Sequence, residues 1–145
     1  MGIQLLDCSP MESLRSLDES LATLDAQVEG EYVFATVDTI PEGLEPFAVI
    51  REAEGLTVVA PAAEALRYGL GNTQVFTRIT PTAVTPLATT GLTAIIAQTI
   101  ASRGIPCNVI AGYFHDHFFV PADRGTEVAR MLHNLSEQAQ GWLGD

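Results

Sequence analysis

Residues 103–121 read RGIPCNVIAGYFHDHFFVP, and this stretch decides the fold that we expect for the chain. Gly104 ends a helical pattern, and an apolar strand pattern follows from Cys107 to Phe114. A polar His-Asp-His turn then leads into a second apolar strand, His117 to Val120. The stretch therefore predicts a β-hairpin that follows a helix.

The segments on either side of this hairpin extend the pattern. A strand from Gln74 to Thr80 is ended by Pro81, and a threonine-rich loop covers residues 82–90. The helix before the hairpin and the helix after it each carry an apolar face at helical spacing. The face of the first helix consists of Leu92, Ile95, Ile96, Thr99 and Ile100. The face of the second consists of Val128, Met131, Leu132, Leu135, Ala139 and Trp142. The second half therefore reads strand, helix, strand, strand, helix.

The first half shows a related order of elements. A capping box at Ser9 and leucines at helical spacing predict an amphipathic helix that Gly30 ends. The elements expected after it are a strand over 31–37, a loop, a hairpin of strands over 46–52 and 56–60, and a short helix from Pro61 to Tyr68. Because a proline precedes the helix after each hairpin, Pro61 and Pro121, we expect an internal structural repeat, in an α+β sandwich with helices on one face of a sheet.

Composition limits the classes of function. The 145 residues are 47% hydrophobic, which suits one domain or two very small ones that share a core. The net charge is −11, with 18 acidic residues against seven arginines and no lysine, so nucleic acid and membrane surfaces are unfavourable partners. No apolar stretch is long enough to span a membrane, and no secretory signal pattern begins the sequence.

Motifs for catalysis and for metal binding are missing from the sequence. Cys8 and Cys107 form neither a CxxC pair nor a zinc spacing, so a reduced, cytoplasmic setting is the simplest interpretation. His115 and His117 could share one strand face, but the one remaining histidine, His133, lies on the final helix, which favours a polar turn over a metal site. No serine lies in a GxSxG elbow, and no phosphate-binding glycine loop is present, so we expect no enzyme activity, no cofactor and no metal.

Several motifs together resemble the ACT family, specifically small proteins with two ACT-like units and the ACT units of CASTOR-type arginine sensors. The matching stretches are GLTA at 91–94, GI at 104–105, GYFHDH at 112–117, VP at 120–121, and, in the first half, 46–52 and 54–59. The resemblance implies tandem ACT-like, ferredoxin-like units with an antiparallel sheet. Residues 1–71 would form an N-terminal helix plus a first, degenerate unit, and residues 72–145 the second unit. The first unit is degenerate because residues 38–45 leave room for a loop but not for the usual crossover helix.

The resemblance also implies a regulatory role, because ACT units typically bind amino acids or similar small molecules where two units meet. Carried over to this sequence, the ligand-binding residues are Thr89, Thr90, Gly91 and Leu92 in the loop before the helix and Asn108, Gly112, Tyr113 and Asp116 on the facing strand. A helix N-terminus suits a carboxylate, and Asp116 could pair with an ammonium or guanidinium group. The same residues also have ordinary structural explanations as caps, bulges and turn formers.

The sequence therefore predicts a cytoplasmic regulatory module without catalysis that binds a small molecule, most simply an amino acid, and forms homo-oligomers. The alternative is a ligand-free ACT-like module for oligomerisation or interaction. In that alternative, the apolar strand 118–120 and Trp142 could form an oligomer interface, although both also suit an intrachain core.

Overall fold

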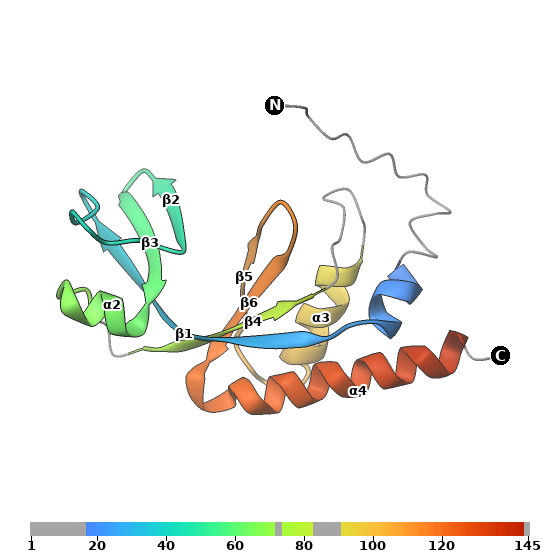
Figure 1. Cartoon of the computed structure of the whole chain (residues 1–145). Coiled ribbons are helices and arrows are strands. Elements are labelled where there is room, and N and C mark those ends of the chain that lie inside the picture. The colour runs from blue at the N-terminus through green and yellow to red at the C-terminus, as the bar shows by residue number, and fades with distance from the viewer. Residues whose placement is uncertain (1–16, 72–73, 83–90, 144–145) are drawn as a thin grey trace.

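A computed structural model describes residues 17–71, 74–82 and 91–143 of the chain (Figure 1). Residues 17–22 are helical and lead into the first strand. The elements that follow are β1 (Ala26–Val37), β2 (Ala48–Glu52), β3 (Gly55–Pro61), α2 (Ala62–Arg67), β4 (Phe76–Pro81), α3 (Leu92–Ala101), β5 (Asn108–Ala111), β6 (Asp116–Pro121), the 3-10 helix η1 (Ala122–Arg124) and α4 (Gly125–Leu143).

The strands in the described residues form one antiparallel sheet of six, in the order β2-β3-β1-β4-β6-β5. Read from its two edges, the sheet gives the same order twice, β2-β3-β1-β4 and β5-β6-β4-β1. In each order, three strands come from one half of the chain, and the fourth is the first strand of the other half, β4 or β1. This repeated order confirms the expected tandem, ferredoxin-like arrangement, whereas the boundary between units at residue 71 stays a prediction.

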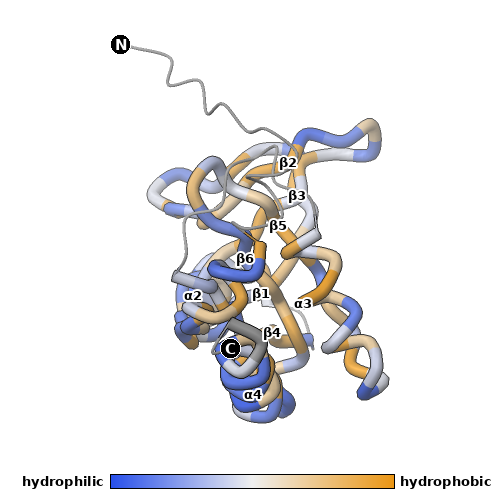
Figure 2. Tube along the Cα trace, turned by 90° about the vertical axis from the view of Figure 1, so that its right-hand side faces the viewer, coloured by the Kyte–Doolittle hydropathy of each residue, from blue (hydrophilic) through white to orange (hydrophobic). Residues whose placement is uncertain are grey.

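The three α-helices that the structure describes after β1 pack on one face of the sheet. Strand register places Thr77 and Ile79 of β4 on the same face as Val33 of β1, because Glu31 lies opposite Thr77. The core on this face consists of two clusters. The cluster under α3 and α4 includes Ile79, Leu92, Ile96, Ile100, Phe118, Val120, Val128 and Leu132. The cluster under α2 consists of Val33, Leu44, Val58, Ala60 and Ala65. Helix α4 runs beneath both central strands (Figure 1), and it carries both hydrophilic and hydrophobic residues (Figure 2).

The other face of the sheet carries a layer of aromatic rings. The hairpins β2–β3 and β5–β6 both rise on this side of β1 and β4, so residues of the two halves meet above the central strands (Figure 1). The ring of Phe47, from the first half, makes edge contacts with Phe119 at 5.9 Å and with His117 at 4.9 Å, both from the second half. Tyr32 and Phe34 join this layer from β1. The halves are thus joined by side chains as well as by the β1–β4 pairing.

The expected N-terminal helix is wrong in its second part, while its start lies outside the described residues. The helix ends near residue 22, and β1 begins at Ala26. Val28, expected on the apolar helix face, lies in β1 opposite Ile79, and its side chain is 55% exposed. Gly30 does not end a helix: its φ of 107° lies where the register between β1 and β4 shifts, so it forms a bulge in the strand. Pairing with β4 overrides the helical spacing.

Other expectations are confirmed, with shifted boundaries. Residues 38–47 contain turns and bends and no helix, as expected for the first half. The strand expected over 107–114 is shorter, because residues 112–115 form the turn that leads into β6. Phe118, Phe119 and Val120 are fully buried, which makes them intrachain core. The side chain of Trp142 lies outside the described residues.

Candidate functional site

The N-terminus of α3 is built on a glycine. Gly91 has a φ of 103°, a backbone conformation that L-residues with side chains rarely adopt, and its carbonyl accepts the first hydrogen bond of the helix from Ile95 N at 2.9 Å. A Cβ added at Gly91 would lie 3.3 Å from Leu17 Cδ2, so packing also favours glycine. Gly91 has no side chain that could cap this helix end, and the first-turn N–H groups of a helix carry the partial positive charge of the helix dipole.

Asp116, the first residue of β6, lies against this helix end. Oγ1 of Thr93, in the first turn of α3, donates a hydrogen bond to Oδ2 of Asp116, and both side chains are half-buried. Asp116 also lies opposite Ala111 at the end of β5. The structure therefore brings the Gly91 turn and Asp116 together. Thr93 was not predicted for this grouping, because its role depends on a residue 23 positions away.

The turn between β5 and β6, residues 112–115, lies directly before Asp116. The N–H of Gly112 donates to the carbonyl of His115 at 2.8 Å, and a Cβ at Gly112 would lie 2.9 Å from that oxygen. The turn therefore needs glycine for close packing. Tyr113 and Phe114 are 49% and 58% exposed, and their ring centroids are 4.8 Å apart. An exposed pair of aromatic rings thus lies in the turn that precedes Asp116.

The other predicted ligand-binding residues are placed differently. Leu92 is 3% exposed and belongs to the core, so only its backbone can face a ligand. Asn108 lies at the opposite end of β5, across from Phe119, and therefore on the aromatic face, whereas Asp116 lies on the helix face. The structure does not bring Asn108 to the Gly91 turn. Thr89 and Thr90 lie outside the described residues.

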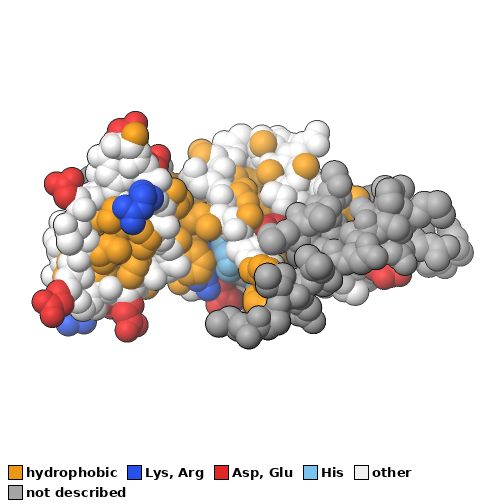
Figure 3. Space-filling model, turned by 90° about the horizontal axis from the view of Figure 1, so that it is seen from above, with side chains coloured by type: hydrophobic (Ala, Val, Ile, Leu, Met, Phe, Trp, Pro, Cys, Tyr) orange, Lys and Arg blue, Asp and Glu red, His pale blue; other side chains and the backbone are white. Residues whose placement is uncertain are grey.

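The His-Asp-His turn sends its side chains to both faces of the sheet. Nδ1 of His117 lies 2.8 Å from Oγ1 of Thr80 on the aromatic face. Burial is the main cause that lowers the pKa of His117, and the charges of Arg78 and His115 lower it further. Figure 3 shows a histidine on this face between apolar side chains. Within the described part of the chain, no three histidine, cysteine or acidic residues gather as metal ligands.

Arg78 of β4 lies near this histidine and contacts the aromatic layer. Its Cζ atom is 4.3 Å from the ring centroid of Phe47 and 5.0 Å from that of Tyr32, so the cation stacks against rings from two segments. Nη2 of Arg78 lies 3.7 Å from Oε2 of Glu29 near the β1 bulge. Local sequence patterns do not indicate this cluster, because its members come together only through strand pairing and the curl of the sheet.

Comparisons with known proteins agree with this architecture. Residues 12–78 match the family described as the ACT domain. A Vibrio cholerae protein of unknown function, named a possible transport protein, is 38% identical, and the match covers 86% of this chain and 98% of that chain with a TM-score of 0.73. The chain belongs to the same family as that protein. No curated protein matches it.

Two more distant structures share the fold alone. The regulatory subunit of aspartate kinase from Thermus thermophilus, in its ligand-free form, is 14% identical over 77% of this chain and 95% of that chain, with a TM-score of 0.55. A protein from Agrobacterium tumefaciens is 16% identical over 78% of this chain and 89% of that chain, with a TM-score of 0.62. Among the described helices, none is long and apolar enough to cross a membrane.

Proposed function

We propose that this chain is a cytoplasmic regulatory module, without catalysis of its own, that binds an amino acid or a related small metabolite. The observation that carries the proposal is the contact between the first turn of α3 and Asp116, made through Thr93. The N-terminus of a helix that begins at a glycine and a carboxylate thereby lie at one place, where the carboxylate and the ammonium of an amino acid can each meet a group of opposite charge.

The two groups divide the recognition of an amino acid between them. The first-turn N–H groups after Gly91 attract the ligand carboxylate, since a helix N-terminus binds anions. The carboxylate of Asp116 pairs with the ligand ammonium, and such charge-assisted hydrogen bonds are about twice as strong as neutral ones. Thr93 is a positioning residue, because its hydroxyl holds one oxygen of Asp116.

Family relationships support the same function. The sequence resembles ACT units, including those of CASTOR-type arginine sensors, and residues 12–78 match the ACT domain. The regulatory subunit of aspartate kinase shares the fold. In this proposal the chain acts as a homo-oligomer and has neither nucleic acid nor a membrane as a partner.

A ligand-free module for oligomerisation is the second candidate, and one observation favours it. The edge strand β2 exposes Val49 and Ile50, which are 43% and 42% accessible to solvent. An apolar edge strand can pair with another chain. In this case the protein would assemble through β2 and bind no metabolite.

A thermal-shift screen against the twenty amino acids at 5 mM separates the two candidates. A ligand that binds the folded state raises the free energy of unfolding, by about 2.7 kcal/mol at a hundred times its Kd, and so raises the melting temperature. We expect one or a few amino acids to raise the Tm, and Asp116→Ala to abolish that rise while the protein stays folded. Asp38→Ala, which removes an exposed acid elsewhere, is the matched control. No shift with any amino acid, together with a stable oligomer, would favour the second candidate.

A further inference from the structure

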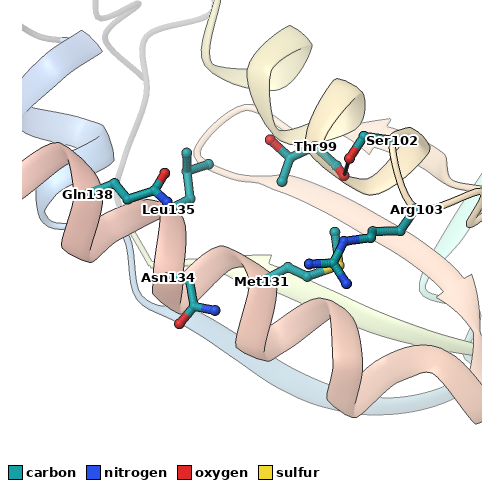
Figure 4. A pocket seen from close by; sticks show the side chains of 7 residues that line it. All are labelled: Thr99, Ser102, Arg103, Met131, Asn134, Leu135 and Gln138. Atoms are coloured by element: carbon teal, nitrogen blue, oxygen red, sulfur yellow. Dashed lines mark hydrogen bonds between the residues drawn. The ribbon is translucent and has the colours of Figure 1, made fainter.

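A hollow lies at the C-terminal end of α3, between its last turn and the middle of α4 (Figure 4). Its volume is about 250 Å³. The residues that line it are Thr99, Ser102, Arg103, Met131, Asn134, Leu135 and Gln138. Helix α3 is about 15 Å long at 1.5 Å per residue, so this pocket is separate from the turn at Gly91.

The walls of this pocket combine one cation, polar groups and an apolar side. The side chain of Arg103 reaches from the end of α3 toward α4 (Figure 4). Asn134 and Gln138 lie four residues apart on α4 and so share one side of the helix. Met131 is 8% exposed, and it and Leu135 adjoin the main core. The pocket can therefore hold a molecule with a polar end and an apolar end.

The charge of the pocket favours an anion. None of the seven described lining residues is acidic, so a ligand ammonium would find no counter-charge there. Among the residues that the structure describes, Arg103 forms no salt bridge. Glu127, a nearby acid, is bound to Arg124 through Oε2 at 2.6 Å and Oε1 at 3.1 Å. The guanidinium of Arg103 therefore stays available for a ligand.

The C-terminus of α3 does not oppose an anion as strongly as an open helix end would. Its last carbonyls accept hydrogen bonds from within the turn, as Gln98 O does from Ser102 N and Ala101 O from Gly104 N, both at 2.9 Å. The N–H of Arg103 likewise donates to Ile100 O at 3.1 Å. Because these three N–H groups are engaged, a phosphate dianion would meet a single cation and no cradle of backbone donors.

We propose that this pocket binds a small organic monocarboxylate with a short apolar chain. The carboxylate takes the planar fork of Arg103, a geometry that forms two parallel hydrogen bonds. The apolar chain rests on Met131 and Leu135, and the amides of Asn134 and Gln138 border the carboxylate end. The volume of about 250 Å³ lies below the roughly 300 Å³ of common ligand pockets, which limits the ligand to a short acid. This proposal does not depend on an amino acid at Asp116.

Titration of the isotope-labelled full chain, followed by backbone amide chemical shifts, tests this proposal with butyrate as the probe. Butylamine and inorganic phosphate at matched ionic strength are the comparison ligands. We expect butyrate alone to cause saturable shifts at residues 99–103 and 131–138. Arg103→Gln should weaken binding at least tenfold, whereas Arg130→Gln, which removes an exposed arginine outside the pocket, should leave it unchanged.

The proposal would be overturned by no saturable shift with butyrate up to 50 mM, by an equal response to phosphate or butylamine, or by unchanged affinity in Arg103→Gln. Butyrate shifts confined to residues 91–93 and 116 would also overturn it, since they would assign the acid to the other end of α3. Failure of this proposal is distinguishable from failure of the proposed function, because the amino-acid response depends on Asp116 and not on Arg103.

Discussion

Oγ1 of Thr93 donates a hydrogen bond to Oδ2 of Asp116, and this bond ties the first turn of α3 to the first residue of β6. Thr93→Val keeps the shape of the side chain and removes the donor. A hydrogen bond to a charged group contributes about 1.5–3 kcal/mol, so we expect the variant to weaken amino-acid binding roughly tenfold or more. Isothermal titration with an amino acid found in the screen measures the change.

The control for Thr93→Val is Thr99→Val, in the same helix. The hydroxyl of Thr99 donates to Ile95 O at 2.7 Å and lies at the far end of α3 from Asp116, so this variant should leave amino-acid affinity unchanged. Equal affinity in Thr93→Val and the wild type would remove the Thr93–Asp116 bond from the recognition of the ligand.

Two glycines of α4 should respond in opposite directions to the same substitution. A Cβ at Gly125 would lie 2.8–2.9 Å from three side-chain atoms of Thr77, so Gly125→Ala should lower the free energy of unfolding by about 1–3 kcal/mol. A Cβ at Gly141 has nothing within 4 Å, so Gly141→Ala should raise it by up to about 1 kcal/mol. Urea unfolding measures both values. A stabilised Gly125→Ala protein would contradict the packing of α4 on β4.

The stacked cation of Arg78 should contribute to the stability of the whole sheet. Arg78→Met removes the contacts with the rings of Phe47 and Tyr32 and keeps an unbranched side chain. We expect a loss of about 1–3 kcal/mol in the free energy of unfolding, measured in urea. Arg51→Met, at an exposed position on the edge strand β2, should change it little. Equal stability of the two variants would mean that stacking at Arg78 contributes nothing.

Stability should fall in mildly acidic solution because of His117. Burial, with the charges of Arg78 and His115, lowers the pKa of this imidazole below its ordinary 6.5 in the folded protein. As the pH falls, the imidazole therefore takes up its proton in the unfolded chain first. The stability that the neutral imidazole contributes is present above pH 6.5 and is lost as the pH falls from 6.5 through the lower pKa of the folded protein. The charges of Asp116 and Glu29 raise the pKa of His117, but less than burial and the other charges lower it.

His117→Phe is the variant that checks this pH dependence. It keeps a ring against Phe47 and removes the titration, so melting temperatures should fall less between pH 7.5 and pH 5.5 than in the wild type. His133→Gln, at an exposed position of α4, should keep the wild-type slope. A wild-type slope in His117→Phe would assign the acid sensitivity to other groups.

Local patterns predicted most of the second half of the fold. The two apolar runs separated by a polar turn in residues 103–121 predict the hairpin, and the face formed by Val128, Leu132 and Ala139 predicts the burial of α4, where all three are fully buried. Gly30 was misread because a glycine after helically spaced leucines suits a helix end as well as a bulge. The pairing of its neighbours Val28 and Glu31 with β4, about 50 residues later, decides between the two, and local sequence does not show that pairing.

The candidate site was predictable only in part, for a similar reason. Gly91 and Gly112 stand out because each is required by its own backbone or turn. Thr93 and the position of Asn108 depend on strand register and on how α3 lies against β6, which arise from packing across the sheet. The pKa of Cys107 was likewise set by its surroundings: the half-buried thiol packs against the core, and burial raises its pKa to about 11, in keeping with an unreactive residue.

The central claim, that an amino acid binds between the first turn of α3 and Asp116, is tested most directly by backbone amide chemical shifts of the full chain. The titrant is the amino acid that raises the melting temperature, compared with the same amino acid carrying an acetylated amine. We predict saturable shifts at residues 92–94 and 116 with the free amino acid, and loss of these shifts with the acetylated form, because Asp116 then lacks its ammonium partner. Saturable binding without shifts at these residues, or equal binding of the acetylated form, would contradict the account.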